Sequence, residues 1–318
     1  MRSAIALALA LLAPHPALAW CRTASCPMGQ VGARCMPPTM DDCGVELFWP
    51  TQCVGFSIQK DGAPGLTATK VDSIAKLAFA AWMNVDCGGG EHPAIHVSDL
   101  GEVSCNQVEY NPKGANSNTI MFRSNGWPYT KTNALALTTV TYNLDTGEIR
   151  DADMELNSTD VKFSTSDTTV TYDLQSIMTH EAGHFLGLAH SQIENATMRP
   201  DYPMGSTMLR TPQVDDIQAI CNAYPPTLPT ACDPTPRGGL GDACNSPAVT
   251  TPTTTSGCCA VAVGASPEGS EAALAFGALG VVFGLRSLRK RRRRSEAQRA
   301  HPPHREARDP NPRPGSRS

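Results

Sequence analysis

Alternating apolar and polar residues predict a series of short β-strands along the first half of the chain. Residues 53–60 alternate over the length of a strand, and residues 95–100 and 118–123 are two further short strand candidates. Residues 134–142 and 148–156 flank Asp145-Thr146-Gly147, which is a turn-forming sequence. We therefore predict a hairpin from these last two segments.

Apolar residues at helical spacing predict three helices among and after these strands. The first begins near Val71, with Thr69 and Asp72 as a capping pair. The second covers residues 174–186, and the third opens with Pro212 at its first helical position. Periodicity alone thus assigns the chain to the α+β class.

The second predicted helix carries the densest chemical signal, the sequence His180-Glu181-Ala182-Gly183-His184-Phe185-Leu186-Gly187-Leu188-Ala189-His190. Histidines four residues apart lie one above the other on a helix face, so both can reach one ion. Gly187 can turn the backbone at the helix end and bring His190 back as a third ligand. Three protein ligands leave a fourth position for water, which is the catalytic arrangement of zinc. Glu181 would then lie where a carboxylate can take a proton from that water.

This segment resembles the zinc helix of the metzincin metalloproteases, and within them it most resembles the matrixins. Asn195-Ala196-Thr197-Met198-Arg199-Pro200 supplies the methionine-containing turn that is the second signature of the family. The resemblance covers residues 47–225 and is dense only from Asp173 onward. Some relatives place a tyrosine two residues after the methionine, whereas this chain has Pro200 there, so we assign Tyr202 no metal role.

The resemblance implies a fold and a set of site residues. The implied fold is a metzincin, or zincin-like, catalytic domain with a twisted, mixed and mostly parallel sheet, three main helices, and an active-site cleft between an upper and a lower subdomain. The implied roles are one catalytic zinc held by His180, His184 and His190, Glu181 as general base, and Met198 as the apolar floor under the metal.

Carboxylates alternate along the predicted strand that follows the turn. Asp151, Asp153 and Glu155 therefore share one face of that strand. Matrixins often hold calcium or a second zinc around the corresponding strand, and oxygen ligands suit calcium. This chain has Asp153 where many relatives have a zinc-binding histidine, which disfavours a second zinc. A Ca²⁺ site and a solvated edge-strand face that discourages aggregation both remain open.

Composition adds an export signal and a disulfide framework. Residues 1–19 combine Arg2, an apolar run and Ala17-Leu18-Ala19, as in a secretory signal peptide. All 12 cysteines follow it, and ten of them lie before residue 245, which favours disulfides in an exported chain. Spacing does not fix their connectivity; Cys87 with Cys105 is one suggestion. Cys35 is assigned to a disulfide rather than to an inhibitory role at the zinc.

Charge separates the body from the C-terminal end. Residues 20–285 carry 13 Lys and Arg against 27 Asp and Glu, whereas residues 286–318 carry 12 against 3. An acidic body argues against nucleic acid as a partner. The apolar run 272–285 before this basic block resembles the C-terminal sorting tails of myxobacterial surface proteins. The alternative is a disordered tail with a basic patch.

These observations predict six segments. They are a signal peptide (1–19), a Cys-rich N-terminal arm (20–46), a catalytic domain (47–226), a Pro/Thr/Gly-rich linker (227–257), a Cys, apolar and Arg-cluster anchor tail (258–294) and a disordered basic end (295–318).

The predicted function is exported, zinc-dependent endopeptidase activity on polypeptides that pair with an edge strand. We expect a monomer at the cell surface or outer envelope, tethered to a membrane by its tail, or secreted after tail processing. Two alternatives are a surface-displayed binding or adhesion module with little turnover, and a maturation protease dedicated to one surface partner.

Overall fold

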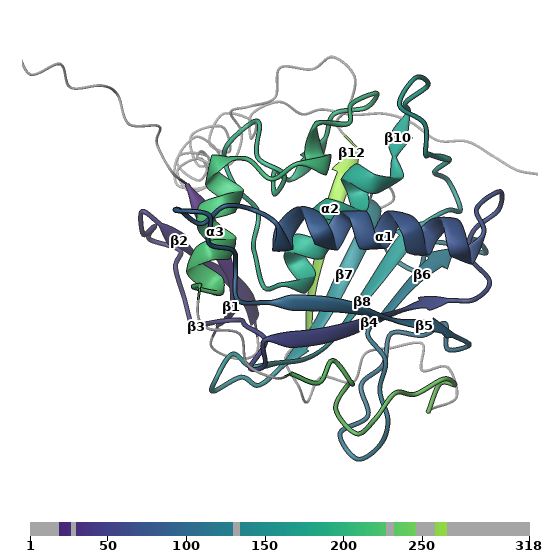
Figure 1. The fold of residues 1–318 in the computed structure, drawn as a ribbon, viewed down its shortest axis with the longest axis horizontal. Coiled ribbons are helices and arrows are strands. Elements are labelled where there is room, and N and C mark those ends of the chain that lie inside the picture. The colour runs from purple at the N-terminus through teal and green to yellow at the C-terminus, as the bar shows by residue number, and fades with distance from the viewer. Residues whose placement is uncertain (1–18, 27–29, 130–133, 227–231, 246–257, 266–318) are drawn as a thin grey trace, which may run out of the picture. The chain divides into compact units, whose positions relative to one another are not determined.

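The computed structural model describes residues 19–26, 30–129, 134–226, 232–245 and 258–265 (Figure 1). The chain divides into two compact units, Met1–Ser266 and Pro267–Ser318, and all described residues lie in the first. The expected signal sequence up to residue 18, the apolar segment with its Arg cluster, and the basic end lie outside the described residues. Within the described part, no helix is both long and apolar enough to cross a membrane.

A mixed sheet forms the centre of the described unit. Its strands, in spatial order, are β11 (Asp201–Tyr202), β12 (Cys258–Ala265), β7 (Ala134–Tyr142), β8 (Ile149–Asn157), β6 (Thr119–Arg123), β4 (Cys53–Gln59) and β5 (His96–Val103). The strands β5, β4, β6 and β8 are parallel, and β7 runs antiparallel to β8 as the predicted hairpin requires. The prediction of an α+β fold with a mixed, mostly parallel sheet is confirmed.

Three α-helices accompany the sheet, and two of them cover the same face of it (Figure 1). They are α1 (Ala68–Met83), α2 (Leu174–Phe185) and α3 (Val214–Ala223), with a 3₁₀ turn, η2 (Met208–Arg210), before α3. The α1 side chains Phe79 and Trp82 pack onto α2, and the indole of Trp82 donates to the carbonyl of Thr179 at 2.7 Å. The zinc helix predicted from the sequence is thus a buried central element.

The predicted starts of the first and third helices are each wrong by a few residues. Thr67, not Thr69, caps α1, because its backbone is extended and its hydroxyl accepts from the amide of Lys70 at 3.2 Å. The third helix begins at Val214 rather than at Pro212, because the extended residue Gln213 is its cap and donates its amide to Asp216 at 2.8 Å.

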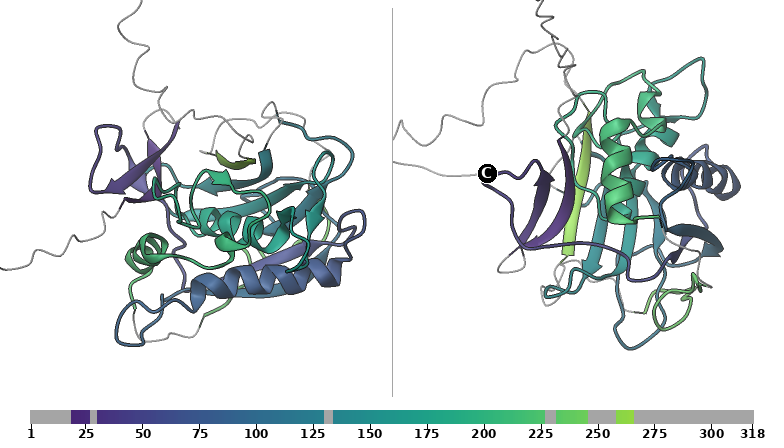
Figure 2. Two further views of the ribbon diagram at one scale, coloured as in Figure 1. Left: turned by 90° about the horizontal axis from the view of Figure 1, so that it is seen from above. Right: turned by 60° about the vertical axis from the view of Figure 1, so that its left-hand side comes forward.

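The expected N-terminal arm is a small antiparallel sheet beside the main one (Figure 2). Its strands are β1 (Trp20–Cys26), β2 (Gln30–Met36) and β3 (Val45–Glu46). Two disulfides, Cys21–Cys35 and Cys26–Cys43, tie the arm together. The assignment of Cys35 to a disulfide is therefore confirmed.

Three further disulfides connect distant segments, and they correct the suggested pairing of Cys87 with Cys105. The bonds are Cys53–Cys232, Cys87–Cys221 and Cys105–Cys244. The suggestion is wrong because Cys87 pairs with Cys221 in α3, whereas Cys105, beyond the end of β5, pairs with Cys244. The described part of the expected linker, residues 232–245, is fixed to β4 and to the end of β5 by two of these bonds.

Two of the short strands that the sequence did not predict, β9 (Phe163–Ser164) and β10 (Tyr172–Asp173), pair in parallel just before α2. Asp173 ends β10 and caps α2 by accepting from the amide of Ser176 at 2.8 Å. Its carboxylate is fully buried and is held by Arg210 through two hydrogen bonds of 2.7 and 2.6 Å. The start of the zinc helix thus depends on a buried ion pair.

Replacing Arg210 with alanine leaves the Asp173 carboxylate buried without its cation. We expect Arg210→Ala to lower the free energy of unfolding by about 3 kcal/mol, measured by denaturant titration. Lys76→Ala is the control, because Lys76 pairs with Asp72 and Asp99 on the exposed face of α1, where ion pairs contribute little. Equal, small effects of both substitutions would show that the buried pair does not stabilise the fold.

Candidate metal centre and active site

Three histidine side chains converge at the end of α2. His180 and His184 are one helical turn apart, and their Nε2 atoms lie 3.0 Å from each other. The Nε2 atom of His190 lies 3.2 Å from that of His184. The first two imidazoles are buried and the third is half-buried, so the site opens on the side of His190.

The other ring nitrogens determine which form these imidazoles take. Nδ1 of His180 lies 2.7 Å from the carbonyl of Thr197, and Nδ1 of His184 lies 2.8 Å from the carbonyl of Leu188. A carbonyl only accepts, so each Nδ1 carries the proton and each Nε2 presents a lone pair. Burial, and then the neighbouring imidazoles, lower the pKa of both histidines well below the ordinary value, so both are neutral.

Neutral imidazoles with facing lone pairs are the donor set of a zinc site. Lone pairs about 3 Å apart repel one another unless a cation lies between them, and three nitrogen ligands with one open position suit catalytic zinc. Among the described residues, one other group brings three candidate ligand atoms together: Cys105, Glu109 and Cys244. Its two sulfur atoms form a disulfide and cannot act as thiolate ligands. The histidine triad is therefore the site that fits a metal.

Gly187 makes the turn that brings His190 to the other two histidines. Its φ is +86°, and a Cβ atom there would lie 2.6 Å from the carbonyl oxygen of Leu47. Both the positive φ and the close backbone contact require glycine. The prediction that this residue turns the chain at the helix end is confirmed.

Strand β1 holds the loop between the second and third histidines. The amide of Thr23 donates to the carbonyl of Gly187 at 2.9 Å, and the amide of Ala189 donates to the carbonyl of Cys21 at 3.0 Å. The hydroxyl of Thr23 also donates to the carbonyl of Leu188 at 2.8 Å, the same carbonyl that orients His184. The N-terminal arm thus positions the metal ligands, a role that the sequence analysis missed because the pairing joins segments 165 residues apart.

Met198 of the methionine turn packs against α2, and its role as the floor under a metal stays a prediction. It is 2 % exposed, and its sulfur packs so closely on α2 that a Cβ atom at Gly183 would lie 2.2 Å away. Asp216 of α3 fixes this turn by accepting from the amides of Thr197 at 2.7 Å and Met198 at 3.0 Å. Burial raises the pKa of Asp216 to about 6. The sequence analysis missed this residue, although a carboxylate in a helical first turn was visible as a signal.

Glu181 is buried on α2 next to the triad. The hydroxyl of Thr138, on β7, donates to its Oε2 atom at 2.6 Å. This contact orients the carboxylate and connects it to β7 of the central sheet. Thr138 carries no sequence signal, since its role depends on where β7 lies relative to α2.

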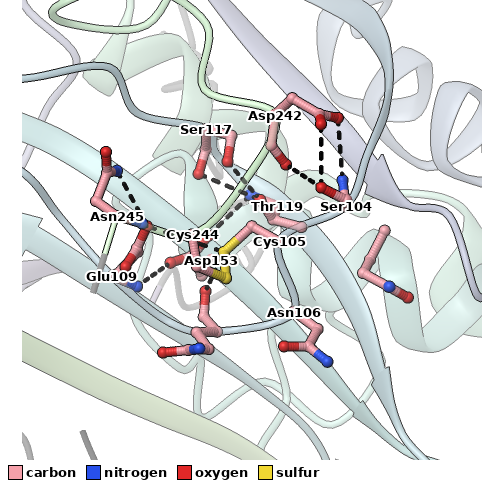
Figure 3. The surroundings of a disulfide bond; sticks show 12 residues. Ser104, Cys105, Asn106, Glu109, Ser117, Thr119, Asp153, Asp242, Cys244 and Asn245 are labelled. Atoms are coloured by element: carbon pink, nitrogen blue, oxygen red, sulfur yellow. Dashed lines mark hydrogen bonds between the residues drawn. A yellow bond between two sulfur atoms is a disulfide. The ribbon is translucent and has the colours of Figure 1, made fainter. Parts of the chain in front are cut away.

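The alternating carboxylates of β8 are buried. Figure 3 shows the surroundings of one of them, Asp153. Asp153 accepts from the amides of Thr119 at 2.8 Å and Glu109 at 3.1 Å, beside the Cys105–Cys244 disulfide. Burial raises the pKa of Asp153 well above its usual range.

Glu155, two residues along β8, pairs with Arg123 and accepts from the hydroxyl of Tyr129. Asp151 is buried on the same strand. A solvated edge-strand face is wrong for these residues, because β8 lies between β6 and β7 and all three side chains are buried. Calcium binding there stays a prediction. Tyr202 is buried too, and its hydroxyl donates to the carbonyl of Ser206 at 2.6 Å.

Comparison with known proteins also points to a zinc metalloprotease family for the segment that contains the histidines. The family model of the matrixins matches residues 103–225, which include α2, the three histidines and the methionine turn. This segment is matrixin-like. The matrixin family implies zinc and metalloendopeptidase chemistry, and the histidine triad that zinc requires is present. With its mixed sheet and three helices, the described unit has a metzincin-like fold.

Two curated relatives match shorter stretches of the matrixin-like protein. Human neutrophil collagenase is 38 % identical over 85 residues, which is 24 % of this chain and 18 % of the relative. Metalloendoproteinase 5-MMP of Arabidopsis thaliana is 41 % identical over 56 residues, which is 18 % of this chain and 15 % of the relative. The chain thus spans less than a fifth of the length of either relative.

A test of the ligand loop uses two glycines with positive φ. Gly65 has φ +80° and open space around its Cβ position, whereas Gly187 meets the Leu47 carbonyl. We expect each glycine-to-alanine substitution to cost about 1 kcal/mol of folding free energy from the backbone conformation. Gly187→Ala should cost more and weaken zinc affinity by about tenfold or more. Denaturant titration and zinc titration measure the two effects, and an unchanged zinc affinity in Gly187→Ala would contradict the role of this turn.

Proposed function

We propose that this protein is an exported zinc endopeptidase that hydrolyses polypeptides with Glu181 as general base. The observation that carries the proposal is the convergence of three imidazole Nε2 atoms beside a buried carboxylate. Bound zinc supplies Lewis-acid polarisation of a water and of the scissile carbonyl. Both curated relatives bear the names of proteases, which supports the same reaction.

In this proposal Glu181 moves the proton. It takes a proton from the attacking water and later passes it to the leaving amine. The hydroxyl of Thr138 holds one carboxylate oxygen and would fix the orientation of the carboxylate during these proton transfers. Neutral His180 and His184 keep their lone pairs for the metal because their Nδ1 atoms donate to backbone carbonyls.

Strand β7 is the proposed substrate platform. In the sheet it pairs with β8 on one side and with β12 on the other, so without β12 it would be an edge strand, and its Thr138 contacts the proposed catalytic carboxylate. An extended polypeptide can pair with such an edge through backbone hydrogen bonds, which favours protein substrates. The segment after Met198, residues 200–206, would shape the specificity pocket.

Export and surface attachment complete the proposal. Five disulfides in the described residues support an oxidising compartment. The expected signal peptide and the apolar, Arg-terminated tail would deliver the protein to the cell surface or outer envelope, with secretion after tail processing.

Removal of the Glu181 carboxylate tests the mechanism. We expect Glu181→Ala to retain one zinc per chain and to lose at least about 100-fold in peptide cleavage rate. Glu194→Ala is the matched control, because Glu194 is an exposed carboxylate on the loop after His190. Metal content and cleavage of a fluorogenic peptide are the measurements, and full activity in Glu181→Ala would refute the mechanism.

A substrate panel distinguishes the proposal from its alternatives. The zinc-loaded protein is incubated with casein and with a peptide library, with and without a chelator. Broad, chelator-sensitive cleavage supports a general endopeptidase, and cleavage of one narrow motif supports a maturation protease. Absence of cleavage in a chain that binds zinc supports a surface binding or adhesion module.

A further inference from the structure

A segment of the chain itself occupies the edge of β7. Strand β12 (Cys258–Ala265) pairs antiparallel with β7, with Cys258 opposite Thr141 and Val263 opposite Ala136. Its last two residues pair in parallel with Asp201 and Tyr202 of β11. Figure 2 shows β12 as the yellow-green strand beside the strands of the core sheet. The backbone groups of β7 that would bind an extended polypeptide are therefore already paired.

The register places β12 at the level of the catalytic carboxylate. Val261 is opposite Thr138, and Thr138 is the residue whose hydroxyl holds Glu181. On its other side, β12 pairs with β11, and β11 begins three residues after Met198. Strand β12 thus lies between the two segments that flank the metal centre.

The sequence of β12 suits this position. Cys-Cys-Ala-Val-Ala-Val-Gly-Ala contains no charged residue and no proline, so nothing in it opposes extended pairing. The segment is also tethered: 13 residues separate it from Cys244, which is bonded to Cys105. A tether of this length gives an effective local concentration on the order of millimolar.

We propose that Cys258–Ala265 is an intramolecular peptide ligand of the catalytic edge, which blocks β7 in the intact chain and must leave before another polypeptide can pair there. The proposal rests on the function assigned to β7 above. It makes the C-terminal segment an autoinhibitory element as well as the connection to the tail.

Hydrogen exchange measures the occupancy without any turnover. All proteins carry Glu181→Ala, so that self-cleavage cannot change the exchange rates. The compared proteins are the intact chain, a chain ending at Gly257, and the double variant Val261→Pro/Ala262→Pro. Successive residues of a strand point their amides to opposite sides, so two adjacent prolines remove at least one donor that faces β7. Thr254→Pro/Thr255→Pro is the matched control outside β12.

We expect the alternate amides of β7 that face β12 to exchange slowly in the intact chain and in the control. They should exchange at least about tenfold faster in the truncated chain and in the β12 proline variant. Equal exchange in all four proteins would overturn the proposal. The truncated chain keeps the result interpretable if the proline variant does not fold.

Binding of a probe gives a second readout. The probe is a fluorescent peptide with the sequence of residues 256–266, in which serine replaces both cysteines. It should bind the truncated Glu181→Ala chain at least about tenfold more tightly than the intact one, and equal binding would count against the proposal. Neither readout needs catalysis. A protein without peptidase activity can therefore still show a blocked β7, and a protein with an open β7 can still be a peptidase, so the two proposals fail separately.

Discussion

The metal centre depends on two backbone carbonyls that lie outside the zinc helix. Thr197 and Leu188 accept from the Nδ1 atoms of His180 and His184 and so point both Nε2 lone pairs inward. A helix alone would place these imidazoles on one face but would leave their rotation and tautomer undetermined. The rigidity of the site therefore depends on the two loops that carry these carbonyls. Much of the structure around the site holds these loops in place.

Each loop is held by an element that is remote in sequence. Strand β1 pairs with the backbone around Leu188. Asp216 of α3 accepts from the backbone amides of Thr197 and Met198. The Cys21–Cys35 bond keeps β1 in its hairpin, and Cys87–Cys221 ties α3 to the segment after α1. These two disulfides thus act on the site through the elements that hold the loops.

The sequence predicted the features that depend on local residue spacing. The positions of His180, His184 and Gly187 follow from helical geometry and from one backbone turn, and the hairpin of β7 and β8 follows from its turn residues. Cysteine pairing and the clamp by β1 could not be predicted, because they depend on which distant strands become neighbours. Strand β12 was missed for a further reason: its small, apolar residues read equally well as part of an anchor tail.

The three long disulfides also set an order of events. They join cysteines 179, 134 and 139 residues apart, and their later members are Cys232, Cys221 and Cys244. In the export proposed above, none of these covalent links could form until the chain has emerged as far as Cys221 in α3. The arm, with partners only 14 and 17 residues apart, can close long before that. In an exported chain, the last disulfides of the described unit would thereby form only after almost all of it has left the compartment in which it was made.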